Sequence, residues 1–204
     1  QSILSKCLKD KNKDLLEMNS EINKLTEKNK ITVYNNIIKI IKKKNELSLE
    51  CKIDYIIENL FEKCILQNIF ASLYICFLSK LIKDKQHNIN TIVFKKTIKI
   101  IKNLNNIILN IDNIENYDLD KNKFSALIKN GMDYNKHFQS LGNIYSILYL
   151  YDIIENKVFL ELILKYINII NDFIQWDPFC NKKLEKIINI LIGLIEYGYF
   201  KLIK

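Results

Sequence analysis

Arginine is absent from this chain, so all 31 basic residues are lysines. Its absence excludes arginine-finger chemistry and the bidentate guanidinium forks that recognise carboxylates and phosphates. The dominant residues, isoleucine, lysine and asparagine, have codons rich in A and T, which indicates a biased genome such as that of a parasite or a large virus. Many of the lysines and asparagines are therefore interpreted as solvated surface.

Proline occurs once, at Pro178, and glycine only four times, so few sharp turns are available. The five cysteines form no Cys-x-x-Cys pair, and their odd number is typical of a reducing compartment in which thiols serve as small apolar side chains. No apolar run approaches the ~20 residues of a membrane span, and no signal peptide is visible. We therefore expect a cytoplasmic location, in the host cytoplasm if the source is a virus or an intracellular parasite.

Catalytic and metal-ligating constellations are missing as well. His87 and His137 are isolated, with no cysteine three or four residues away, and His87, in a predicted loop, is interpreted as solvated. Glu58 and Glu62 lie one helical turn apart, a spacing that permits metal binding or acid/base work but is more often a solvated face. No Gly-rich phosphate loop and no nucleophile with a nearby base is present. We expect no enzyme activity, no cofactor and no bound metal.

Helical periodicity dominates what remains. In residues 89–111, apolar residues such as Ile89, Val93, Ile100 and Leu104 recur at spacings of three, four and seven, which predicts one buried helix face. The same reasoning predicts helices at 31–45, 49–66, 69–83, 141–154, 156–174 and 181–196. We expect consecutive antiparallel hairpins, pairing 31–45 with 49–66, 69–83 with 89–111, and 141–154 with 156–174.

A unit of about 40 residues made of two helices is typical of HEAT-type repeats, in which stacked neighbours share one core. We therefore expect an all-α fold, a right-handed superhelix of about four antiparallel hairpins. Residues 1–20 are interpreted as an N-terminal extension, and residues 21–204 as the repeat domain.

Charge is unevenly distributed along the chain. Residues 24–111 hold 16 lysines against 7 acidic residues, whereas residues 112–178 have a local net charge of −4. A basic half indicates weak, sequence-independent RNA binding or an acidic partner, and solvated lysine faces are the alternative. The candidate RNA-binding lysines are Lys42, Lys43, Lys44, Lys95, Lys96, Lys99 and Lys102.

Residues 140–144 read Ser-Leu-Gly-Asn-Ile, where a helical pattern is predicted to start. A glycine inside a helix costs roughly 1 kcal/mol relative to alanine, and it is tolerated where two backbones approach closely. We therefore expect Gly142, with Asn143 beside it, to have a structural role in a close helix–helix contact.

Several segments, in order, resemble the middle, HEAT-repeat domain of eukaryotic translation initiation factor 4 gamma. Residues 22–26 are similar to its Leu-Asn-Lys-Leu-Thr, residues 60–64 to its Ile-Phe-Glu-Lys-Ala, and residues 140–144 match its Ser-Leu-Gly-Asn-Ile. The full set adds Phe70 and Tyr74, Phe94-Lys95-Lys96 and Leu184-Glu185, and spans about residues 20–196.

The chain also departs from that family. Gln67-Asn68 stands where the family often has an acidic residue and proline, and the segment after residue 144 differs from the family's Gly-Glu-Leu-Phe. The family's fifth repeat has no counterpart before Lys204, so a helicase contact that relies on it would be altered or lost.

The resemblance implies a translation-initiation scaffold that binds a DEAD-box RNA helicase of the initiation factor 4A type and stimulates it during mRNA recruitment. A cap-binding protein is a further possible partner, through segments outside this chain. The spacing of Ile22 and Leu25 suggests one apolar edge at the contact, with packing on the first repeat as the alternative, and Phe70 is expected in the core. The helix end at Glu62-Lys63 and the turn from Asn68 to Phe70 are expected on the same side of the stack as this segment. The candidate helicase-binding residues are Ile22, Asn23, Lys24, Leu25, Thr26, Glu62, Lys63 and Asn68.

Two other interpretations stay open. One is a related scaffold that carries the same repeat domain and acts in mRNA decay, splicing or nuclear cap binding. The other is a generic helical array that binds RNA or acidic proteins and has no helicase partner. Capture of a helicase, and its identity, distinguishes the three.

Overall fold

The computed structural model describes residues 13–43, 47–85, 87, 89–109, 134–176 and 181–202, and all regular structure in these ranges is helical. The all-α prediction is therefore confirmed for this part of the chain. The α-helices are α2 (Lys13–Asn23), α3 (Lys30–Lys42), α4 (Leu49–Leu66), α5 (Ala71–Lys83), α6 (Asn90–Leu109), α8 (Tyr134–Leu150), α9 (Asn156–Trp176) and α10 (Asn181–Leu202), and the 3₁₀ turn η1 (Asn68–Phe70) joins α4 to α5.

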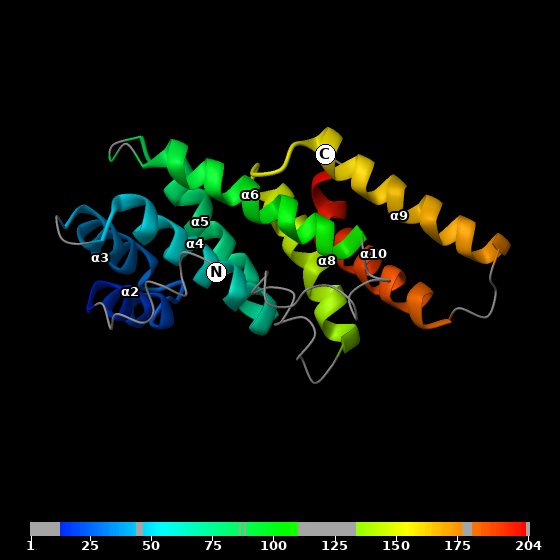
Figure 1. Ribbon diagram of the computed structural model, residues 1–204, viewed down its shortest axis with the longest axis horizontal. Helices are drawn as coiled ribbons and strands as arrows, with labels where there is room; N and C mark the ends of the chain where they lie inside the picture. The colour runs from blue at the N-terminus through cyan, green and yellow to red at the C-terminus, as the bar shows by residue number, and fades with distance from the viewer. Residues whose placement is uncertain are drawn as a thin grey trace.

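The helices form an elongated array (Figure 1). Helices α2 and α3 lie at one end, α9 and α10 lie at the other, and α4, α5, α6 and α8 occupy the middle. Helix α4 contacts α2, α5, α6 and α8, so it links the two ends of the array. A single apolar core runs through it, from Leu15 and Met18 in α2 to Leu194 in α10.

The predicted helices match the observed ones closely where the apolar stripe is continuous, as at 49–66. Two predicted pairings differ from the observed packing. Helix α3 packs more extensively against α2 than against α4, so residues 31–45 and 49–66 do not form the expected principal hairpin. The second difference concerns α8. Helix α8 packs most extensively along α10 and only slightly against α9, so residues 141–154 and 156–174 do not form the expected principal hairpin. The physical reason is the close backbone contact between α8 and α10, at which small residues meet.

That contact is made by two glycines. Gly142 lies in the middle of α8, which begins at Tyr134 rather than near residue 141. A Cβ at Gly142 would overlap the carbonyl oxygen of Ile190 and lie 3.0 Å from the Cα of Gly193. A Cβ at Gly193 would in turn lie 2.8 Å from the backbone nitrogen of Asn143. The expected close approach at Gly142 is therefore present, and Gly193 is its mate on the opposite helix.

Helix α2 crosses the domain boundary expected at residue 20. Its apolar residues Leu15, Met18 and Ile22 recur at three and four and are buried. In addition, the ammonium of the fully buried Lys52 of α4 lies 3.1 Å from a carboxylate oxygen of Asp14 in α2. The packed structure thus includes part of the segment that was interpreted as an extension.

Lys52 also closes the C-terminal end of α3. Its ammonium donates to the carbonyl oxygens of Ile40 (3.1 Å) and Lys43 (2.8 Å). The last carbonyls of a helix have no partner within the helix and carry partial negative charge, so a cation there satisfies both needs. One side chain therefore ties α2, α3 and α4 together.

The turn between α8 and α9 is fixed from α10. Asp152 adopts a positive φ of 61°, and the Lys201 ammonium lies 2.6 Å from its carboxylate. Lys201 also lies over the ring of Tyr149, which stacks on Phe159 of α9 at a centroid distance of 4.3 Å. These contacts hold the C-terminal end of α10 against the start of α9.

Candidate interaction surfaces

Two segments singled out from the sequence meet in space. The Lys63 ammonium, near the C-terminal end of α4, donates to the side-chain oxygen of Asn23 at the end of α2, at 2.5 Å. The residues are separated by 40 positions in the chain. The structure therefore places the 22–26 segment and the 62–63 helix end on one surface, as the sequence analysis expected.

The apolar edge expected within that segment is not formed. Ile22 is 1% exposed and Leu25 is 7% exposed, and both belong to the core, so their proposed direct contact with a helicase is wrong. The physical reason is that Ile22 continues the buried stripe of α2, and the chain then turns at Leu25 to begin the approach to α3.

The polar residues of the segment are at the surface, although two of them are engaged locally. Lys24 is paired with Glu21 at 2.8 Å. Thr26 and Asn29 bond reciprocally, since the Thr26 backbone nitrogen donates to the Asn29 side chain (2.8 Å) and the Asn29 backbone nitrogen to the Thr26 hydroxyl (3.3 Å). This turn presents Asn23, Lys24 and Thr26 on a fixed backbone.

Apolar side chains project instead from the turn between α4 and α5. Leu66, Ile69 and Phe70, here called the turn patch, are 55%, 90% and 54% exposed. The expectation that Phe70 is core is wrong, because η1 turns the chain so that Ala71 rather than Phe70 becomes the first buried residue of α5. Leu66 and Ile69 were not predicted to be exposed, because apolar periodicity does not reveal the 3₁₀ turn.

The turn patch continues the polar surface just described. Residues three and four apart share a helix face, so Leu66 lies one turn beyond Glu62 and Lys63. Asn68, which is only partly exposed, lies within the same turn. The result is a surface with an apolar centre and a polar rim, which is the usual anatomy of a protein–protein contact.

The candidate RNA-binding lysines divide into two groups. Lys43 is paired with Glu17 and Lys96 with Asp54, at 2.8 and 2.7 Å, and Lys44 lies outside the described residues. Lys95, Lys99 and Lys102 are exposed at spacings of four and three along α6, and Lys42 is exposed at the end of α3. No carboxylate in the described ranges pairs with these four.

Weak RNA binding is expected to depend on the α6 lysines. Replacing Lys95, Lys99 and Lys102 with alanine should reduce the slope of log affinity against log salt by about 2, since each neutralised single-strand phosphate contributes about 0.7. Fluorescence anisotropy with a labelled oligouridylate across a salt series measures the slope. The matched control is Lys43→Ala, whose charge is already paired. A slope unchanged in the triple variant would exclude α6 as the contact.

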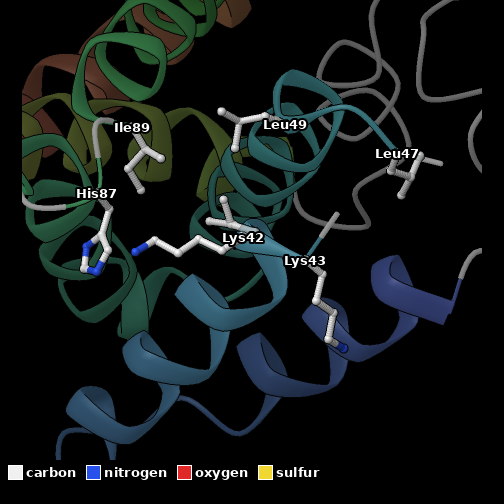
Figure 2. Close-up of a pocket in the computed structure, with 7 residues that line it drawn as sticks. Lys42, Lys43, Leu47, Leu49, His87 and Ile89 are labelled. Carbon is white, nitrogen blue, oxygen red and sulfur yellow. The ribbon is translucent and has the colours of Figure 1, made fainter. Parts of the chain in front are cut away.

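A hollow of about 380 Å³ lies between the end of α3, the start of α4 and the segment before α6 (Figure 2). Ile41, Leu47, Leu49 and Ile89 form apolar walls, and the Lys42 side chain extends toward His87. Lys43 points away from it, toward α2. Such a lining could hold a small acid with an apolar body.

His87, beside this hollow, was expected to be solvated, but the structure shows that its ring is engaged. Its Nδ1 contacts the carboxylate of Asp84, which also accepts a hydrogen bond from the Tyr34 hydroxyl. Burial, and then the hydrogen bond to Asp84, raise the pKa of Tyr34. The contacts of Tyr34, Asp84 and His87 join α3 to the end of α5. Among the described residues that line the hollow there is no hydroxyl or thiol nucleophile.

Metal ligation finds no support in the parts of the chain that the structure covers, where no group of three or more His, Cys, Asp or Glu residues could hold an ion. Within the same parts, no helix has the length and apolar character required to cross a membrane. No family model, no curated protein and no solved structure matches the chain.

Proposed function

We propose that this chain is a scaffold that binds a DEAD-box RNA helicase of the initiation factor 4A type and raises its RNA-dependent ATPase activity. One observation carries the proposal. Segments that resemble the initiation factor 4 gamma domain, far apart in sequence, meet at the Asn23–Lys63 contact beside the exposed turn patch. An isoleucine that is 90% exposed at the tip of a turn is costly to leave in water, and a partner that covers it gains that energy.

The scaffold contributes shape and binding energy, and the helicase contributes the chemistry. A surface that binds best to the catalytically competent arrangement of the two helicase lobes shifts the population toward that arrangement. In this proposal the helices form a right-handed superhelix of about four HEAT-type hairpins. The helicase docks on α4, which has the turn patch at its end. The lysines of α6 add weak contacts to the RNA that the helicase holds.

The test is a double substitution in the turn patch. Ile69→Asp with Phe70→Asp is expected to weaken helicase binding by roughly 30-fold or more, since the loss of even one interface anchor costs about 2 kcal/mol. The melting temperature should stay unchanged, because substitutions of exposed residues rarely alter stability. Binding is measured by biolayer interferometry with a cognate helicase, and function by stimulation of its ATPase activity.

The matched control is Leu16→Asp, which changes an apolar residue of similar exposure, 62%, elsewhere on the surface, on α2. It should leave both measurements at the parent level. A parent chain that captures no helicase and leaves the ATPase rate unchanged would refute the proposal. The α6 lysines would then favour the alternative of an RNA-binding helical array, and capture of a different helicase would favour a related scaffold in mRNA decay, splicing or cap binding.

A further inference from the structure

Helix α10 exposes an apolar stripe along its whole length. Its members are between 37% and 52% exposed and recur at steps of four, three, four and three, and they are Ile188, Ile192, Ile195, Tyr199 and Leu202. Steps that alternate between three and four define the seam along which one helix packs against another. In the described part of the chain, each of these side chains therefore keeps more than a third of its surface exposed.

Helix α9 repeats the pattern. Leu160, Leu164, Ile167 and Ile174 are between 38% and 60% exposed, at steps of four, three and seven. The position that the last step skips holds Asn171, which is exposed. A single polar residue in an apolar seam is a known device for fixing register and the number of helices that associate.

The two stripes lie on the same side of the helix pair. Gly198 of α10 faces the ring of Phe159 in α9, and in each helix a stripe residue follows the contact residue by one position. One position is about 100° around a helix. Helices α9 and α10 run in opposite directions (Figure 1), and in each of them the stripe lies one position after the contact residue. Both stripes therefore face the same side of the helix pair.

The combined surface, here called the α9–α10 face, has the size of a complete interface. Nine side chains are on average almost half exposed, and a large apolar side chain presents on the order of 200 Å², so together they expose roughly 800 Å². Patches on monomers rarely exceed about 600 Å². A stable complex of standard size uses about 800 Å² from each partner.

We infer that the α9–α10 face binds the same face of a second copy of this chain, forming a two-fold symmetric dimer. Charge favours this occupant over a partner of opposite charge. Helix α9 holds two lysines and two acidic residues, so it is neutral in a chain with a net charge of +8. The dimer therefore joins the chains along a helix of zero net charge, and the lysines of α6 remain outside the contact.

The charges of α9 are also self-complementary. Lys165 and Asp172 lie on either side of Asn168, and a two-fold axis reverses the direction of the helix in the second copy. With the axis between Asn168 and Ile169, Lys165 of one copy faces Asp172 of the other. The antiparallel arrangement therefore pairs opposite charges, whereas a parallel one would align like charges.

Sedimentation equilibrium of the full chain, at micromolar to submillimolar concentration, tests the inference. The parent is expected to show twice the mass of one chain. Ile195→Glu places a charge at the centre of the face and should weaken the dimer by roughly 30-fold or more, with an unchanged circular dichroism spectrum. Ile167→Glu places a charge in the α9 stripe and should weaken the dimer by a similar factor. It serves as the test if the first variant does not fold.

Two further variants make the test specific. Val158→Glu is the matched control, because Val158 is 46% exposed on α9 but lies off the stripe, and it should keep the dimer. Lys165→Glu should weaken the dimer, and Lys165→Glu combined with Asp172→Lys should restore it. A parent chain that remains monomeric, or a dimer that survives both stripe substitutions, overturns the inference. Neither result bears on the turn patch, so helicase binding stands or falls separately.

Discussion

Gly142→Leu is expected to lower the free energy of unfolding by about 3 kcal/mol or more, at the upper end of the effects of overpacking. The cause is that the atoms met by the new side chain belong to backbone. Even a Cβ overlaps the carbonyl oxygen of Ile190 and lies 2.9 Å from the nitrogen of Leu194, and both atoms are held by the hydrogen bonds of α10. Relief requires α8 and α10 to separate along their whole contact. Urea denaturation followed by circular dichroism measures the change.

The two glycines of α10, Gly193 and Gly198, supply the controls. Gly193→Leu should cost about as much, and the double variant less than the sum, because both changes open the same contact. Gly198→Ala should cost less, since the added Cβ would overlap the edge of the Phe159 ring at Cζ, and a side chain yields more readily than a helix backbone. If Gly142→Leu unfolds at the same urea concentration as the parent, the close approach of α8 and α10 is not present in solution.

Sequence periodicity predicted the helices well and their pairing less well. The isoleucine stripes of α4 and α6 are long enough to fix both the type and the extent of these helices. The early start of α8 was not predicted, because its first six residues, Tyr-Asn-Lys-His-Phe-Gln, contain only two apolar residues, which are too few to show a stripe. Helix α2 was missed because its stripe has only three members.

The pairing of α8 with α10 depends on information that periodicity does not carry. Gly142 and Gly193 are far apart in the chain, and each by itself looks like a weak point in a helix. Only their juxtaposition explains both. Ser146 reinforces the contact by donating a hydrogen bond to the carbonyl of Gly193 at 3.0 Å. No local sequence pattern predicts this bond.

The candidate surface shows the same limit at single residues. The sequence indicated correctly that the 22–26 segment and the 62–63 helix end share one side, but it assigned the apolar anchors to the wrong positions. Ile22 and Leu25 have the spacing of either an exposed edge or a buried stripe, and spacing alone does not say which side faces the core. Phe70 and Ile69 are exposed because of one 3₁₀ turn, whose geometry three residues do not encode unambiguously.

The second large effect follows from that correction. Ile22→Ala combined with Leu25→Ala is expected to lower the free energy of unfolding by about 4 to 10 kcal/mol, since truncating each buried aliphatic side chain costs about 2 to 5 kcal/mol. A domain of this size has about 5 to 15 kcal/mol in total. The variant should therefore melt far below the parent in a thermal scan by circular dichroism, or fail to fold at ambient temperature.

This prediction separates a core role from an interface role at the same residues. An interface role would leave the melting temperature unchanged and weaken only helicase binding, whereas the burial of both side chains requires the melting temperature to fall. Leu16→Ala is the matched control on α2, because that leucine is 62% exposed and its truncation should be nearly neutral. If the double variant loses stability while Ile69→Asp with Phe70→Asp loses only helicase binding, α2 supports the surface from beneath and the turn patch makes the contact. Equal melting of the double variant and the parent would place Ile22 and Leu25 back at the surface.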